Sequence, residues 1–122
     1  MNRLASIRPS VASTILAAAA VAVVAAPQKP GLPGGKMLLE NDRIVVVEGI
    51  VAPGDVNRMH KHELRSVVVC IEGATIKETL PDGRTRTYGR KPGDVAWRDA
   101  GLLHEELNVG ETRLRVIAVQ LK

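Results

Sequence analysis

Aromatic residues are nearly absent from this chain of 122 residues, which has one Trp, one Tyr and no Phe. The interior must therefore be filled by Val, Ile, Leu and Ala, and few rings are present to stack on bases or sugars. The single cysteine, Cys70, cannot form an internal disulfide, so the fold has to be stable through packing alone. Because Cys70 lies in a Val-rich segment, we expect a small buried apolar side chain there.

A strong excess of one sign of charge is also missing. The chain has 17 Lys and Arg against 13 Asp and Glu, which gives a formal net charge of +4. This charge falls to +2 if Arg3 and Arg8 are removed with the N-terminal segment. Without a basic run or interleaved aromatic residues, no binding to nucleic acid is expected. The length allows one domain with a modest core.

Residues 1–26 have the pattern of an export signal. Arg3 and Arg8 form a basic start, and residues 11–26 are small or apolar without a charge. The alternative is an uncleaved membrane anchor, although a membrane-spanning helix needs about 20 apolar residues and this run is shorter and rich in Ala. We predict a cleaved signal helix, a periplasmic or secreted protein, and contact with the membrane only through that signal.

From residue 36 onward, β-prone segments alternate with turn sequences, after a Pro/Gly linker at 27–35. Turn signals include Pro53-Gly54-Asp55, Pro81-Asp82-Gly83 and Pro92-Gly93-Asp94. No window has a convincing helical period. The expected strands are 43–52, 57–64, 66–71, 74–80, 84–88, 95–98, 104–109 and 113–121. Residues 36–122 are therefore predicted to form one all-β domain, an antiparallel barrel or sandwich.

All three histidines lie in two short stretches, His60-Lys61-His62 and the segment around His104. On a strand, residues two apart point to the same face, with side-chain roots roughly 6–7 Å apart. This spacing lets His60 and His62 share one metal ion, and His104 can supply a third nitrogen from another strand. The alternative is three polar residues in a barrel that holds no metal.

Two charged residues share faces with these histidines by the same alternation. Glu106 has the parity of His104 and could approach the ion, orient a ring or act as a general base, the alternative being a solvated strand residue. Arg58 has the parity of His60 and could bind a substrate carboxylate, the alternative being an arginine at the barrel rim in water. Glu63 falls on the opposite face and is a poor metal ligand.

The other face of the segment after His62 is also apolar. Val67, Val69 and Ile71 occupy it, and apolar residues on both faces indicate that both faces are covered. We therefore expect a homodimer. Trp97 is expected in the core or along the pocket. Arg84 and Arg86 alternate with threonines and are expected on an exposed hairpin face.

The two histidine stretches, taken with the surrounding glycines, resemble the two motifs of the cupins, in order and separated by a hairpin. The resemblance spans about residues 40 to 120. It is closest to the compact single-domain cupins with a Pro-Asp-Gly hairpin and a Leu-Lys ending. Two positions depart from the motifs: Ser66 stands where a glutamate is expected, and Asp99 replaces a proline. The matching residues are Gly54, His60, His62 and Gly73 in the first motif and Gly93, Gly101, His104 and Asn108 in the second.

The resemblance implies a double-stranded β-helix around a pocket for a metal or a small ligand. With Ser66 in place of the glutamate, three neutral imidazoles leave a bound ion at +2, and Fe, Zn, Mn, Ni or Cu are all candidates. The first candidate function is a metal-dependent enzyme, of dioxygenase or isomerase type, acting on a small carboxylated molecule. The alternative is a non-catalytic periplasmic module that binds a small ligand or a metal.

Overall fold

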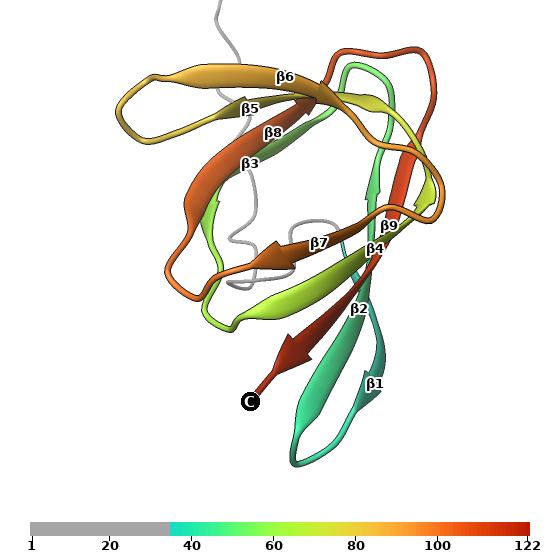
Figure 1. The fold of residues 1–122 in the computed structure, drawn as a ribbon, viewed down its shortest axis with the longest axis vertical. Helices are drawn as coiled ribbons and strands as arrows, with labels where there is room; N and C mark the ends of the chain where they lie inside the picture. Colours follow the sequence, from blue (N-terminus) through green and yellow to red (C-terminus); the bar gives the residue numbers. More distant parts are fainter. Residues whose placement is uncertain (1–34) are drawn as a thin grey trace, which may run out of the picture.

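The computed structural model describes residues 35–122, which form nine strands (Figure 1). The predicted signal peptide, and all of the predicted linker except Gly35, lie outside these residues. Within the described range, no helix is long and apolar enough to cross a membrane. The strands are β1 (Lys36–Glu40), β2 (Ile44–Val51), β3 (Val56–Lys61), β4 (Ser66–Glu72), β5 (Thr75–Thr79), β6 (Thr85–Gly89), β7 (Val95–Arg98), β8 (Leu103–Asn108) and β9 (Leu114–Leu121).

The strands pair antiparallel in two sheets that form two layers (Figure 1). One sheet has five strands in the order β1-β2-β9-β4-β7, and the other has four in the order β3-β8-β5-β6. The all-β antiparallel prediction is therefore confirmed. The predicted closed barrel is not confirmed, because among residues 35–122 no strand of one sheet is hydrogen-bonded to a strand of the other. The chain instead passes between the sheets through turns, at every connection except the β1–β2 and β5–β6 hairpins.

Strand positions follow the β-branched runs and the turn sequences closely. β4 contains the Val67–Val69 run, β7 has the predicted bounds, and Gly83 and Gly93 adopt the positive φ that their turns require. β1 was not predicted. Its sequence, KMLLE, has no β-branched residue and all five residues are exposed, so pairing with β2 and not local preference makes it a strand.

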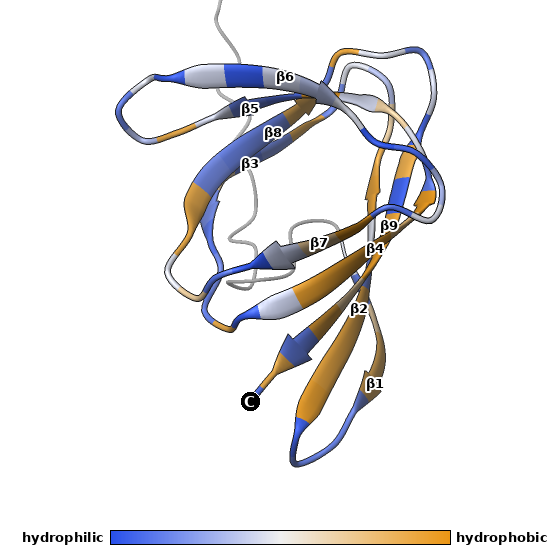
Figure 2. Cartoon of the chain, in the orientation of Figure 1, coloured by the Kyte–Doolittle hydropathy of each residue, from blue (hydrophilic) through white to orange (hydrophobic). Residues whose placement is uncertain are grey.

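The apolar core is small. Its main cluster consists of Val51, Cys70, Ala74, Ile76 and Leu114, with Tyr88 and Val116 packed against it, and Val47 and Val68 are buried as well. Cys70 is 1% exposed, as expected of a small buried apolar residue. Figure 2 shows that β2, β4 and β9 are mainly hydrophobic, whereas β3, β5, β6 and β8 are mainly hydrophilic. The four-stranded sheet therefore presents polar side chains to the interior, and this is where the histidines lie.

The asparagine of the second motif holds the β8–β9 connection against β2. Asn108 is fully buried, and its Nδ2 donates to the carbonyls of Val51 and Thr112, both at 2.8 Å. Its Oδ1 accepts from the backbone N–H of Gly110 at 3.0 Å. Three hydrogen bonds from one buried side chain give Asn108 a structural role.

Asn108→Ala should lower the free energy of unfolding by about 2–4 kcal/mol, because three hydrogen bonds are lost and the buried carbonyl of Val51 loses this partner. Urea unfolding of the chelator-treated protein measures this loss. Asn41→Ala is the matched control: Asn41 also bonds two backbone N–H groups, but at an exposed turn, so its loss should stay below about 1 kcal/mol. Equal losses in the two variants would contradict the role of Asn108.

Candidate metal centre

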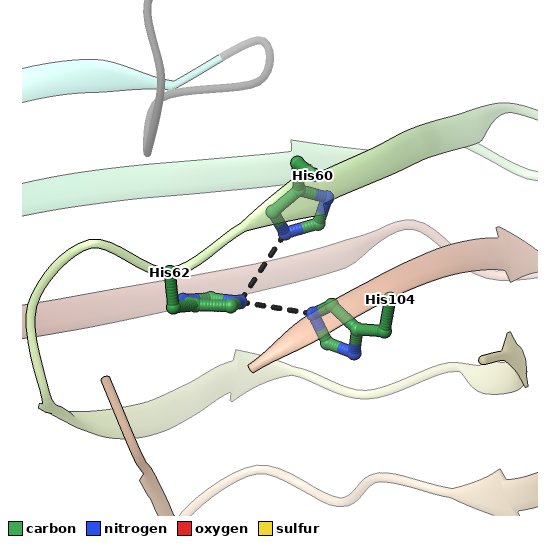
Figure 3. A group of neighbouring side chains, drawn as sticks. All are labelled: His60, His62 and His104. Carbon is green, nitrogen blue, oxygen red and sulfur yellow. Dashed lines mark hydrogen bonds between the residues drawn. The ribbon is translucent and has the colours of Figure 1, made fainter. Parts of the chain in front are cut away.

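Three elements bring the histidines together. His60 on β3 pairs directly with His104 on β8. His62 lies just beyond β3, where its N–H donates to the Leu102 carbonyl at 2.8 Å and its carbonyl accepts from Gly101 at 2.7 Å. Gly101 turns the chain there with a φ of 86°. The candidate ligand atoms of the three rings all lie within 4.8 Å of one another, so the predicted convergence is observed (Figure 3).

Two of the rings are fixed in one tautomer. Nδ1 of His60 lies 2.8 Å from the carbonyl of Arg58, and Nδ1 of His104 lies 2.6 Å from Oε1 of Glu78. Because a carbonyl and a carboxylate accept hydrogen bonds, each Nδ1 carries the hydrogen and donates it. Nε2 of both rings is thus left with a lone pair, and both lone-pair nitrogens face His62 (Figure 3). Hydrogen-bond acceptors on Nδ1, the nitrogen that points away from the site, orient metal-binding histidines in the same way, and Nε2 is then the inner nitrogen.

Two of the spacings between the Nε2 atoms match those around one metal ion. Nε2 of His62 lies 3.2 Å from that of His60 and 2.9 Å from that of His104. Metal–nitrogen bonds of about 2.0–2.1 Å, at angles of about 90–110°, place ligand nitrogens about 2.9–3.4 Å apart. Ser66, buried at the position of the expected glutamate, lines the same cavity and adds no charge. The donor set is therefore three neutral imidazoles, which suits Zn, Cu, Fe and Ni.

Burial keeps the ring nitrogens available for a metal at neutral pH. It is the largest cause that lowers the pKa of His60 and of His62, and it brings His62 to about 4 together with the two neighbouring rings. A metal competes with protons for the same lone pairs, so a low pKa favours metal binding.

Without metal, the protein should lose stability as pH falls from about 6.5 toward 4. In the unfolded chain these histidines take up protons near their ordinary pKa of 6.5, whereas the folded protein resists protonation. Each proton bound only by the unfolded chain favours unfolding. Thermal unfolding of chelator-treated protein at pH 7.5, 6, 5 and 4 measures the effect. A flat melting temperature between pH 7.5 and 5 would contradict the buried, neutral rings.

Glu78 is the carboxylate behind His104, and the sequence reasoning missed it. It is 2% exposed, accepts a hydrogen bond from Nδ1 of His104 and forms an ion pair with Arg86. Burial alone would raise the pKa of Glu78, but hydrogen bonds from Arg86 and His104 outweigh it and the net pKa is lowered. Arg86 itself is 66% exposed, as expected of the hairpin face, yet its guanidinium reaches the buried carboxylate. Glu78 therefore stays charged and holds the His104 ring.

Glu106 lies in the same cavity as the histidines, on the face of His104 that alternation predicts. Its side chain is 13% exposed, and its Oε1 accepts a hydrogen bond from the Tyr88 hydroxyl at 3.2 Å. Burial, followed by the charge of Glu106, raises the pKa of Tyr88, so the phenol keeps its proton. Arg98 approaches the same Oε1 at 3.8 Å. Glu106 is thus a held carboxylate beside the rings.

The prediction that Arg58 shares the histidine face is wrong. Register shifts between Asn57 and His60, and this irregularity breaks the alternation of two, so Asn57 lines the cavity and Arg58 is exposed. Only the carbonyl of Arg58 contributes, to His60. Glu63 is exposed beside Lys61, away from the rings as expected. Trp97, at 51% exposure, is neither core nor pocket.

The cavity in front of the histidines has a volume of about 80 Å³. Val47, Val116 and Ala118 form part of its apolar wall, and Arg90 and Arg98 add two guanidinium groups. A concave site with a few convergent polar groups against an apolar wall is typical of small-molecule binding.

No model of a known protein family matches this chain, and no curated protein matches it. Solved structures do. A cupin domain from Bordetella pertussis Tohama I is 24% identical, with a TM-score of 0.67 over 80% of this chain and 99% of that one. The polyketide cyclase RemF from Streptomyces resistomycificus is 26% identical, with a TM-score of 0.59 over 78% and 70%. A protein with a double-stranded β-helix domain from Klebsiella pneumoniae is 23% identical, with a TM-score of 0.57 over 76% and 79%.

These similarities agree with the spacing of the two histidine motifs and with the two antiparallel sheets that enclose the rings. The predicted resemblance is confirmed at the level of the fold: the chain is a small protein with the cupin fold.

Proposed function

We propose that this protein is a metal-dependent enzyme that binds a divalent transition metal through His60, His62 and His104 and acts on a small molecule in the adjoining cavity. One observation carries the proposal. Because Nδ1 of His60 and Nδ1 of His104 donate hydrogen bonds, the lone pairs on their Nε2 atoms remain free and are directed toward Nε2 of His62. Such an arrangement has no evident use in packing, because three converging imidazoles contribute little apolar burial.

The metal would supply a Lewis acid for an oxygen atom of the substrate. Glu106 would accept or deliver a proton, since its carboxylate lies in the same cavity and Tyr88 holds it by a hydrogen bond. The wall formed by Val47, Val116 and Ala118 excludes water from the substrate. The likeness to RemF, which is named as a polyketide cyclase, supports an enzymatic role.

The metal content of the purified protein tests the first half of the proposal. About one equivalent per chain should survive dialysis, and the chelated protein should regain it from Zn, Fe(II), Mn, Ni or Cu salts. The second half requires turnover of a small-molecule panel, including oxygen consumption with the iron form. Metal binding with thermal stabilisation by ligands but without turnover would favour the non-catalytic binding module, and absence of metal would overturn the proposal.

We also propose that residues 1–26 direct export and are removed. The basic start and the uncharged run of small residues support this proposal. Intact mass and N-terminal sequencing of the protein from the periplasmic fraction test it. A cytoplasmic protein that keeps Met1 would contradict it.

A second copy of the chain is proposed to cover the outer face of the five-stranded sheet. Val67 pairs with Trp97 and with Val119, and Val69 pairs with Val95, so apolar side chains lie side by side across β7, β4 and β9. Trp97 and Val95 are 51% and 66% exposed, and such patches commonly mark interfaces. A two-fold axis would place identical apolar patches against each other.

The mass in solution tests the dimer. Val95→Lys should convert it to a monomer in light scattering, whereas Val109→Lys, a control at an exposed valine beyond β8, should not. A wild-type monomer at micromolar concentration would overturn the proposal.

A further inference from the structure

Arg98 is a nearly buried cation whose one ion pair is long. Its side chain is 11% exposed and points inward from β7, and it lines the metal cavity. Among residues 35–122, its ion pair is with Glu106 at 3.8 Å, which is longer than a hydrogen bond. A guanidinium has five N–H donors in a planar fork that matches a carboxylate. Most of this donor capacity is thus available to a molecule in the cavity.

Arg90 adds a second cation to the same wall. Its Nε is buried and, within the described residues, has no hydrogen-bond partner. Its guanidinium lies 5.5 Å from the centre of the Tyr88 ring, which limits where the group can go. Gly73 makes this position possible, because a Cβ there would lie 2.2 Å from the Arg90 carbonyl oxygen. An unsatisfied buried donor is costly, so a bound acceptor would stabilise it.

Both arginines also line a second, larger cavity of about 320 Å³. The two cavities therefore share a wall that carries two guanidinium groups. The remaining charges of the second cavity are already occupied: Arg86 pairs with Glu78, and Asp94 accepts the backbone N–H of Lys91 at 2.8 Å. The guanidinium groups of Arg90 and Arg98 in the shared wall are thus the positive charges that can bind an anionic ligand.

We infer that the substrate of the metal centre is a small carboxylate, and that Arg98 and Arg90 bind its carboxylate group. This inference rests on the proposed function and names its substrate class. About 80 Å³ in front of the histidines holds only a few non-hydrogen atoms, since a water takes about 30 Å³ in the liquid. The reacting oxygen faces the rings, and the carboxylate group lies against the shared wall. Next to the negative charge of Glu106, the single charge of one carboxylate group is favoured at this wall over the double charge of a phosphate group.

Calorimetric titration tests the inference on zinc-loaded and metal-free protein with succinate, 2-oxoglutarate, inorganic phosphate and uncharged succinamide. At least one dicarboxylate should bind zinc-loaded protein, more tightly than phosphate or succinamide. Arg98→Gln and Arg90→Gln should each weaken that binding on the order of tenfold or more. Arg84→Gln, at an exposed hairpin arginine paired with Asp82, is the matched control and should leave it unchanged. Metal content and melting temperature establish that each variant is folded and loaded.

The metal-dependent function and the carboxylate site can be disproved independently of each other. A protein that binds no metal but still binds a dicarboxylate through Arg98 and Arg90 would overturn the metal-dependent function and support the carboxylate site. A metal-loaded protein that binds none of the carboxylates would overturn the inference alone. The inference is also overturned if phosphate binds as tightly as the dicarboxylate, or if both arginine variants bind as wild type does.

Discussion

Replacing His104 with alanine should leave the purified protein with less than about a tenth of a metal equivalent, against about one for the wild type. Two imidazoles hold a divalent ion far more weakly than three, and His104 is the ring that Glu78 orients. Inductively coupled plasma mass spectrometry after dialysis against a weak chelator measures the metal. This is the largest effect that we expect from a single substitution.

His104→Ala also removes a partner of buried Glu78, so a misfolded variant could lose metal for another reason. His62→Ala avoids this problem, because His62 lies beyond β3 and its ring faces the other two histidines. It should lose metal equally while keeping the wild-type melting temperature of the metal-free protein. Glu63→Ala, one residue away and exposed, is the control that should keep the metal. Full occupancy in His62→Ala would refute the three-histidine site.

Glu78→Gln should weaken metal binding about 10–100-fold without removing a ligand, because the carboxylate behind His104 orients the ring. Competition with a chromophoric chelator measures the dissociation constant. The visible spectrum of the cobalt form should shift as well, which a purely structural role of Glu78 would not cause.

Glu72→Gln is the matched control, since Glu72 also pairs with an arginine, Arg113, but at an exposed position. It should leave the dissociation constant unchanged. Arg86→Gln should fall between the two, because it removes the second partner of Glu78 and leaves the bond to His104 in place. If Glu78→Gln and Glu72→Gln bind metal equally, Glu78 has no role in the centre.

The sequence was sufficient for most strands and for the histidine cluster. β-branched runs and Pro-Gly-Asp turns are local signals, and they located every strand except β1, which is held in place only by pairing with β2. The convergence of His104 with His60 and His62 depends on the pairing of β8 with β3, which local signals do not encode. There the resemblance between the motifs and the cupins supplied the information.

Predictions from the alternation of side chains between the two faces of a strand were wrong where the strand was irregular or where its polar face was the inner one. The register shift between Asn57 and His60 places Arg58 outside the site, and the local sequence has no signal that predicts this shift. On β7, the apolar residue Trp97 faces outward and Arg98 faces inward, the reverse of the usual rule, because the interior is a polar cavity there. The structure therefore places Arg98, and not Arg58, in the wall of the cavity.

Glu78 was missed although a signal existed. It continues the buried alternation of Ala74 and Ile76, and a charged residue at an inward position needs a buried partner. Identifying that partner required the pairing of β5 with β8, which places Glu78 opposite Glu106 and near His104.

The location of His62 beyond the end of β3 has a mechanical consequence. Two of the rings project from paired strands, whereas the third belongs to the connection that leads to β4. An ion bound to all three would cross-link this connection to the four-stranded sheet. Loading the protein should therefore slow amide hydrogen exchange chiefly at residues 62–65 and 99–102, and loss of the ion should restore the faster exchange there.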